Sequence, residues 1–154
     1  MIDVLDRKIL AVLQSDSSMP NSEIAERVGL SSTPCWRRIQ RLEAAGFFKR
    51  RVVLLNEEKL NVSVSVFIAV RTNQHTKEWA EKFYRAVSSF PEIVDFFRLS
   101  GEIDYLLRAV VPDIKSYDAL YQRLIEKVDL YDVSSMFAME TLKSTTELPL
   151  NYVG

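Results

Sequence analysis

Two kinds of hydrophobic spacing divide the chain, a helical period in its first third and an alternating period further on. In the first third, apolar residues recur every three or four positions, which predicts amphipathic helices. One helix is expected over 3–14, a second from Asn21 as its cap to Gly29, and a third from Ser31 to Gly46. A short helix, a turn containing Gly29 and a further helix make a helix-turn-helix arrangement. An ordinary pair of bundle helices has the same spacing.

The third expected helix combines an apolar stripe with a polar face. On a helical wheel, Cys35, Ile39 and Leu42 fall on one side, so we expect Cys35 to be a buried and inert thiol. Trp36 lies at the flank of this stripe and is expected to pack against the first two helices. The opposite face carries hydrogen-bonding and cationic side chains, namely Thr33, Arg37, Gln40 and Arg41. This face favours contact with DNA, because a merely solvated face more often mixes Glu with Lys.

Basic charge is concentrated in this helix and the segment after it. Residues 31–51 hold six Lys/Arg and one Glu, a net charge of +5, whereas the whole chain carries −1. Residues 1–51 hold nine Lys/Arg and six Asp/Glu (+3), and residues 52–154 hold eleven and fifteen (−4). A polyanionic partner is therefore expected for the N-terminal part.

The segment between the two spacing patterns separates two expected domains. Residues 47–55 read as a strand whose basic start either reaches DNA phosphates, as in winged variants, or is a solvated edge. Residues 56–61 form a polar connector. The expected organisation is a helix-turn-helix (winged-helix-like) domain over 1–51, a linking strand and connector over 52–61, and a second domain over 62–154.

The second domain is predicted to be a β-α-β-β-α-β unit, which makes the chain α+β. Alternation starts at Val62, one helix stops before Pro91, and the last strand is expected over 132–142. This order is the ferredoxin-like arrangement, an antiparallel four-stranded sheet with two helices on one face. The other face holds Phe67 and Ala69. Because an uncovered apolar face predicts a partner, we expect a dimer formed through the sheets.

Composition narrows the function classes. The 154 residues are 47% hydrophobic and 27% charged, as in a folded protein. The single cysteine excludes an intrachain disulfide and a cysteine-rich metal site. No apolar run approaches the roughly 20 residues that span a bilayer, and no signal-peptide pattern is present, so the cytoplasm is expected. His75, the only histidine, falls in a turn without metal-ligand companions. We expect no catalytic residue, no metal site and no cofactor.

The turn at residues 100–104, Ser-Gly-Glu-Ile-Asp, has the most distinctive chemistry outside the basic helix. Gly101 lacks a Cβ, so a ligand can approach its backbone N–H groups. Those groups suit a carboxylate and Asp104 suits an ammonium, which together would hold a zwitterion. A β-hairpin turn with a capping aspartate accounts for the same residues. Residues 134–136 either contribute hydroxyls and a pocket wall to this site or follow ordinary strand alternation.

Several stretches resemble the Lrp/AsnC (feast/famine) family of transcription regulators. They are Leu5–Leu10, Glu23–Ser31, Pro34–Arg38 with Arg41-Leu42-Glu43, Ser100–Leu107 and Thr145–Leu150. The resemblance covers nearly the whole chain. It implies a DNA-binding helix-turn-helix domain, a linking strand, a C-terminal domain similar to the amino-acid-binding ACT fold, and no enzymatic activity. It also implies a regulator of amino-acid metabolism that binds double-stranded DNA as a homodimer assembling to an octamer, with a free amino acid bound between subunits.

The resemblance also implies which side chains bind. The expected DNA-binding residues are Ser31, Ser32, Thr33, Arg37, Arg38, Gln40 and Arg41. The expected effector-binding residues are Leu99, Ser100, Gly101, Asp104, Ser134, Ser135 and Met136. Two alternatives remain open. One is an architectural DNA-bridging protein without a ligand, and the other is a haem-biosynthesis decarboxylase of similar fold, which needs side chains such as histidine around a porphyrin.

Overall fold

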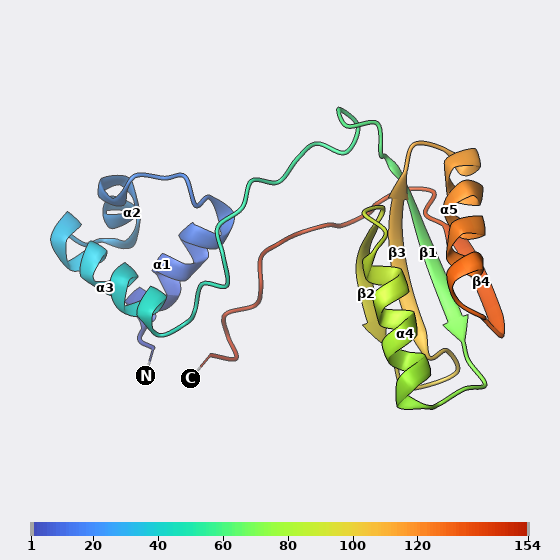
Figure 1. Cartoon of the computed structure of the whole chain (residues 1–154). Coiled ribbons are helices and arrows are strands. Elements are labelled where there is room, and N and C mark those ends of the chain that lie inside the picture. Colours follow the sequence, from blue (N-terminus) through green and yellow to red (C-terminus); the bar gives the residue numbers. More distant parts are fainter. Residues whose placement is uncertain (1, 154) are drawn as a thin grey trace. The chain divides into compact units, whose positions relative to one another are not determined.

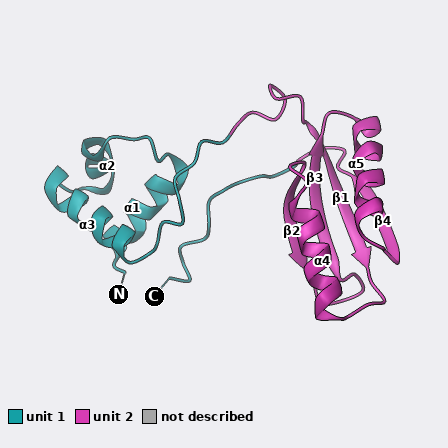
Figure 2. Ribbon diagram, viewed as in Figure 1, with its two compact units in different colours: residues 1–54, 142–154 teal, residues 55–141 magenta. Residues whose placement is uncertain are grey.

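A computed structural model describes residues 2–153, which form two compact units. One unit comprises the chain up to Leu54 together with the residues from Leu142 onward, and the other comprises Leu55–Thr141 (Figure 2). The first unit is helical, and the second contains a four-stranded sheet with two helices (Figure 1). The predicted α+β class is therefore confirmed. Among the described residues, no helix is both long and apolar enough to cross a membrane.

Three short helices form the N-terminal unit. They are α1 (Val4–Ser15), α2 (Asn21–Val28) and α3 (Ser32–Ala44). A reciprocal capping box fixes the start of α1: the Asp3 carboxylate accepts the Asp6 N–H at 2.8 Å, and the Asp6 carboxylate accepts the Asp3 N–H at 3.2 Å. Asp3 caps α1 as predicted, and the bounds of α1 match the predicted helix within one residue.

The turn between α2 and α3 depends on Gly29. Its φ of 75° lies in the left-handed region, which glycine adopts without the steric cost that other residues meet. Asn21 was predicted to cap α2, but Pro20 occupies the cap position and Asn21 is the first helical residue. The Asn21 side chain instead donates a hydrogen bond to the carbonyl of Ser32 at 2.8 Å. The starts of α2 and α3 are thereby tied together.

The three helices enclose one apolar core. Cys35, Ile39 and Leu42 are buried, as their spacing predicts. The other buried apolar residues of this core are Ile2, Ile9, Leu10, Leu13, Ile24, Ala25 and Val28. The core therefore fixes one side of α3 and leaves its opposite side exposed.

The C-terminal residues pack with this helical unit, whereas the predicted domain boundaries placed them with the sheet. Gln14 binds the backbone of Leu148 twice, donating from Nε2 to its carbonyl at 3.1 Å and accepting its N–H at 2.9 Å. Arg7 donates to the carbonyl of Val153 at 2.8 Å, and Leu150 and Val153 pack against the helical core. The last strand ends at Phe137 and not at residue 142 as predicted. The Ala138 N–H still donates to the Ser65 carbonyl at 3.0 Å, and the chain leaves the sheet after it.

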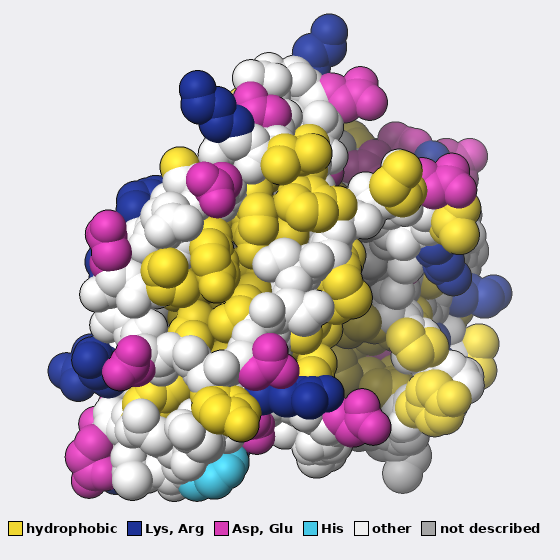
Figure 3. Space-filling view, turned by 90° about the vertical axis from the view of Figure 1, so that its right-hand side faces the viewer, with side chains coloured by type: hydrophobic (Ala, Val, Ile, Leu, Met, Phe, Trp, Pro, Cys, Tyr) yellow, Lys and Arg dark blue, Asp and Glu magenta, His cyan; other side chains and the backbone are white. Residues whose placement is uncertain are grey.

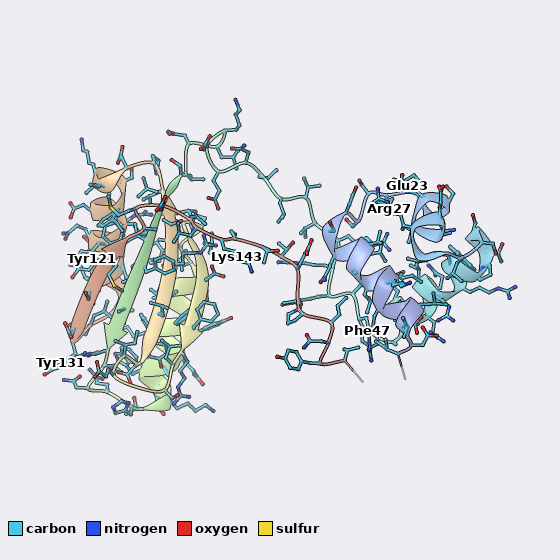
Figure 4. The ribbon with its side chains drawn as sticks, turned by 180° about the vertical axis from the view of Figure 1, so that it is seen from behind. Glu23, Arg27, Phe47, Tyr121, Tyr131 and Lys143 are labelled. Carbon is cyan, nitrogen blue, oxygen red and sulfur yellow. The ribbon has the colours of Figure 1, made fainter. Side chains whose placement is uncertain are left out.

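The predicted strand over 47–55 does not form. The described backbone from Phe47 to Asn56 is irregular, and a strand requires a hydrogen-bonded neighbour, which no described segment provides there. Figure 4 marks Phe47, just after α3. The apolar side chains of Val52, Val53 and Leu54 are consequently exposed.

The second unit has the predicted β-α-β-β-α-β order. Its elements are β1 (Val64–Arg71), α4 (Lys77–Ser88), β2 (Ile93–Arg98), β3 (Tyr105–Val111), α5 (Ile114–Lys127) and β4 (Asp132–Phe137). The sheet order is β2-β3-β1-β4, and all three pairings are antiparallel. Helices α4 and α5 cover one face of the sheet (Figure 1). Alternate residues of β1, namely Val66, Ile68 and Val70, are fully buried beneath them.

Candidate DNA-binding and effector-binding surfaces

The side of α3 away from the core presents Thr33, Arg37 and Gln40 to solvent. Positions three and four apart are neighbours on a helix surface, so these three side chains form one continuous patch. Among the described residues, Arg37 makes no ion pair, and its charge is available to a partner. This patch combines a hydroxyl, a guanidinium and an amide, which are groups that bind base edges and phosphates.

Two of the predicted DNA-binding residues are engaged within the unit. Arg38 Nη1 lies 2.8 Å from Asp6 Oδ1 and 2.6 Å from Asp3 Oδ2, and Arg41 Nη2 lies 2.5 Å from Asp6 Oδ2. Arg38 donates hydrogen bonds to the carboxylates of Asp3 and Asp6, and these bonds raise the pKa of its guanidinium above its usual value. Asp6 is the only charged residue among the buried residues described. Sequence spacing does not reveal these ion pairs, because Asp6 lies on the apolar side of α1.

Ser31 and Ser32 lie at the start of α3. Ser31 is the N-cap residue, with extended backbone angles and no hydrogen bond from its side chain to the helix. Both serines are exposed. The first N–H groups of a helix lack intrahelical partners and suit anions such as phosphate. The start of α3 therefore adds hydroxyl and amide donors to the patch around Arg37.

Trp36 does not pack against the first two helices, and that prediction was wrong. Its side chain is 54% exposed, although it flanks the apolar stripe. Cys35 and Ile39 fill the space beside α1 and α2, so the position next to Cys35 is directed outward. An exposed indole therefore lies among the residues predicted to contact DNA.

The turn between β2 and β3 has the geometry of a tight hairpin. Gly101 has φ of 137°, which other residues rarely adopt, and nothing lies within 4 Å of where a Cβ would stand. Leu99 donates its N–H to the Asp104 carbonyl at 2.8 Å, closing the turn. Ser100 and Gly101 are exposed. The backbone at Gly101 is consequently open to a ligand.

Asp104 connects this turn to the end of β1. Its N–H donates to the Val70 carbonyl at 3.0 Å, and its Oδ2 accepts the Thr72 N–H at 2.8 Å. Asp104 therefore acts as a capping aspartate, which was one of the two interpretations of its position. One carboxylate oxygen is used in this contact, and a carboxylate has a second oxygen with which to accept.

Arg71 was missed in the sequence and lies at the same end of the sheet. Its guanidinium is 3.9 Å from Glu102 of the turn and 3.9 Å from Asp132 at the start of β4. The signal that could have identified it is its position as the first charged residue after the alternating run of β1. Arg71 places a cation beside Gly101 and Asp104, where a ligand carboxylate is expected.

The three predicted residues of β4 do not share one face. Ser135 hydrogen-bonds the hydroxyl of Tyr117 on α5, so it faces the helices. Ser134 pairs with Ala69, and Met136 pairs with Phe67, both on the opposite face of β1. In addition, β1 separates β3 from β4, which puts those two strands roughly 10 Å apart. One copy of the chain does not bring Ser134 and Met136 onto Gly101.

The sheet face opposite the helices is apolar at its centre. Its side chains include Phe67, Ala69, Phe97, Leu106, Val110 and Met136. An ion pair between Arg108 and Asp95, 2.6 Å long, lies on the same face. Phe97 and Met136 are about half exposed. Figure 3, which views the side of the unit that carries α5 and β4, also shows hydrophobic side chains gathered on the surface.

The remaining reactive side chains offer no site in the part of the chain that is described. Cys35 is fully buried, and burial raises the pKa of its thiol. His75 is exposed, as predicted for a turn residue. Between residues 2 and 153, no three His, Cys, Asp or Glu side chains gather in a way that could hold a metal ion.

Two family models match the chain. The AsnC-type helix-turn-helix domain matches residues 2–43, and the Lrp/AsnC ligand binding domain matches residues 65–148. Both matches coincide with the two groups of elements described above, the three helices and the sheet unit.

Known proteins are similar over almost the entire length. The DNA-binding transcriptional activator DecR of Escherichia coli is 44% identical and covers 97% of this chain and 99% of its own. The crystal structure of an AsnC family transcriptional regulator from Agrobacterium tumefaciens is 56% identical, with a TM-score of 0.95 and 99% coverage of both chains. A transcriptional regulator from Neisseria meningitidis, in a crystal structure with L-Met, is 38% identical, with a TM-score of 0.92 and 98% coverage of both chains.

Proposed function

Because the chain belongs to the Lrp/AsnC family of transcription regulators, we propose that it binds specific double-stranded DNA sites as a homodimer controlled by a free amino acid. Its relatives are regulators and not enzymes, so the decarboxylase alternative is dropped. The proposal has a DNA part and an effector part, which rest on different units.

The exposed patch of α3 carries the DNA part. Arg37 has no ion-pair partner among the described residues, whereas the neighbouring Arg38 and Arg41 are paired with Asp6. In the helix-turn-helix arrangement, the second helix enters the major groove and its exposed side chains reach base edges. Arg37 and Gln40 then contact bases or phosphates, and the half-exposed Arg41 contacts phosphate.

Substitution of Arg37 tests the DNA part. A binding site is first enriched from a pool of random duplex DNA with the wild-type protein. Arg37→Ala should weaken binding to that site by about fivefold or more, since a good bidentate contact contributes about 1–3 kcal/mol. The control is Arg85→Ala on α4, an exposed arginine of the other unit, which should bind as the wild type does. Unchanged affinity of Arg37→Ala would contradict this role for α3.

The turn around Gly101 carries the effector part. We place the carboxylate of an amino acid against the backbone N–H groups near Gly101, beside Arg71, and its ammonium against Asp104. Ser134 and Met136 lie too far across β1 to complete this site within one chain. A second copy packed on the open sheet face would supply them, which accounts for a ligand bound between subunits. The L-Met complex of the Neisseria regulator supports the same class of ligand.

The open sheet face supports the assembly. Its apolar centre with a paired Arg108 and Asp95 fits a self-complementary interface, as in a two-fold dimer. Assembly of such dimers into an octamer is part of the proposal. Light scattering coupled to gel filtration measures the mass directly. A monomeric protein at micromolar concentration would contradict the dimer.

Screening of the twenty amino acids tests the effector part and separates it from architectural bridging. A ligand that binds the folded state raises the midpoint of thermal unfolding. One amino acid should raise it, and should also change the affinity for the enriched DNA site. Asp104→Ala should abolish both effects, and Glu78→Ala on the exposed surface of α4 should preserve them. DNA binding indifferent to all twenty amino acids would favour the bridging alternative.

A further inference from the structure

The two tryptophans of the chain have opposite environments. Trp79 is 7% exposed and stacks on Phe83, with ring centroids 5.0 Å apart. Trp36 leaves more than half of its side chain in water. An indole is a large apolar group, and leaving it exposed forgoes the free energy that its burial would contribute. The position therefore suits contact with a partner.

The surroundings of Trp36 indicate which partner. Thr33 lies one turn before it and Gln40 one turn after it, and both are exposed. Side chains in helices lean toward the N-terminus, so the indole covers the first turn of α3. That end of a recognition helix is the end that meets base edges in the major groove. Arg37 is the next residue and makes no ion pair among the described residues, and its free cationic charge favours duplex DNA over an apolar protein surface.

The chemistry of the indole narrows the contact to one base. Its ring offers apolar carbon edges and a single N–H donor, and it has no acceptor. In the major groove, the one exposed apolar group is the C5-methyl of thymine. An apolar side chain beside Thr33 and Arg37 thus discriminates thymine from cytosine through the methyl group.

We infer that Trp36 is a specificity-determining residue that packs on the C5-methyl group of a thymine in each half-site. This inference rests on the proposed DNA binding by α3 and adds a base preference to it. It assigns the amide and guanidinium contacts to Gln40 and Arg37, and the apolar contact to Trp36.

Replacement of a thymine by deoxyuridine tests the contact directly, because it removes only the C5-methyl group of that base. Each thymine in one half-site of the enriched duplex is replaced in turn, and binding is measured for the wild type, Trp36→Ala and Arg37→Ala. At one position the wild type should lose about fourfold in affinity, the expected effect of one buried methyl group. For Trp36→Ala, replacing the thymine at that position should not change the affinity. For Arg37→Ala, the same replacement should still lower the affinity about fourfold. Trp36→Leu, which retains an apolar side chain, should keep part of the discrimination.

The possible outcomes separate this inference from the proposed function. If deoxyuridine replacement lowers the affinity of the wild type and of Trp36→Ala by the same factor, the role of Trp36 is overturned while DNA binding by α3 stands. A change of oligomeric mass in Trp36→Ala would also overturn it, because the indole would then lie in a protein interface. Failure of the wild type to enrich any duplex would contradict the proposed function itself.

Tryptophan fluorescence provides a second test. The variant Trp79→Phe leaves Trp36 as the only indole, and the enriched duplex should protect its fluorescence from quenching by acrylamide. Quenching that is equally strong with and without the duplex would count against the contact.

Discussion

Arg38 on α3 and Asp6 on α1 form an ion pair 2.8 Å long, and the carboxylate is 1% exposed. The second oxygen of Asp6 binds Arg41 one turn further along α3. A buried carboxylate is costly unless its oxygens are paired, and here both oxygens have a guanidinium. These ion pairs attach α3 to α1, in addition to the packing of the core residues Ile39 and Leu42. Asp6 thereby fixes the rotation of α3 about its axis, and with it the direction of Arg37.

Replacing Asp6 with Asn should destabilise the helical unit. An amide is neutral, so Arg41 loses its counter-charge and the partly buried Arg38 keeps only the more exposed carboxylate of Asp3. We expect a loss of roughly 2 kcal/mol in the free energy of unfolding. Urea denaturation measures this. Asp16→Asn is the matched control, because Asp16 is exposed and Asn retains an oxygen that accepts the hydrogen bonds from the N–H and hydroxyl of Ser18. The control should change stability by less than about 0.5 kcal/mol. An equal, small effect for both variants would show that the Asp6 pairs contribute little.

Asp3 should make the stability of this unit depend on acid pH. A hydrogen bond from the Asp6 N–H, followed by the hydrogen bond from Arg38, lowers the pKa of Asp3 below its usual 3.8. A carboxyl whose pKa is depressed on folding stabilises fully above its unfolded pKa and loses that contribution as pH falls through the folded value. The midpoint of urea unfolding should therefore differ between the wild type and Asp3→Asn at pH 5. The difference should shrink below pH 3.8. A difference independent of pH would mean that the carboxylate charge of Asp3 is not involved.

Regular spacing identified the elements whose partners lie close in sequence or in one sheet. The apolar stripe of Cys35, Ile39 and Leu42 and the alternation of β1 both came out as predicted, because each side of those elements meets a different environment. Trp36 was misplaced since periodicity assigns flanking positions poorly. The strand at 47–55 was wrong since alternation does not reveal whether a pairing strand is present.

The hydrogen bonds and ion pairs of individual side chains could not be predicted from the spacing of apolar residues. Nothing periodic links Asp6 to Arg38 and Arg41, or Gln14 to Leu148, because these pairs are 32, 35 and 134 positions apart in the chain. The turn at Gly101 and Asp104 was located by its residue types, and its connection to Thr72 and Arg71 required the sheet register. The residues predicted to bind DNA and the effector remain predictions.

Gln14 should hold the C-terminal tail on the helical unit. Its amide makes two hydrogen bonds to the backbone of Leu148, and each such bond contributes about 1 kcal/mol net. Gln14→Ala should therefore release the tail, and trypsin should cleave faster after Lys143, which precedes the contact (Figure 4). The control is Gln122→Ala on the exposed side of α5, which should leave the cleavage rate unchanged. Equal cleavage of Gln14→Ala and the wild type would show that Leu150 and Val153 hold the tail without Gln14.

The opposite orientations of Ser134 and Ser135 lead to opposite expectations for the effector. Ser135 faces α5 and bonds the hydroxyl of Tyr117, whose phenol pKa is raised by burial. Ser135→Ala should remove a structural hydrogen bond, lower stability by about 1 kcal/mol and leave amino-acid affinity unchanged. Ser134 lies on the open face, where a second copy would meet it, so Ser134→Ala should weaken amino-acid binding without loss of stability. Calorimetric titration with the stabilising amino acid measures affinity, and urea unfolding without ligand measures stability. The reverse result, with Ser135→Ala losing the ligand and Ser134→Ala binding it normally, would place the effector on the helical side of β4 and rule out a site on the open face.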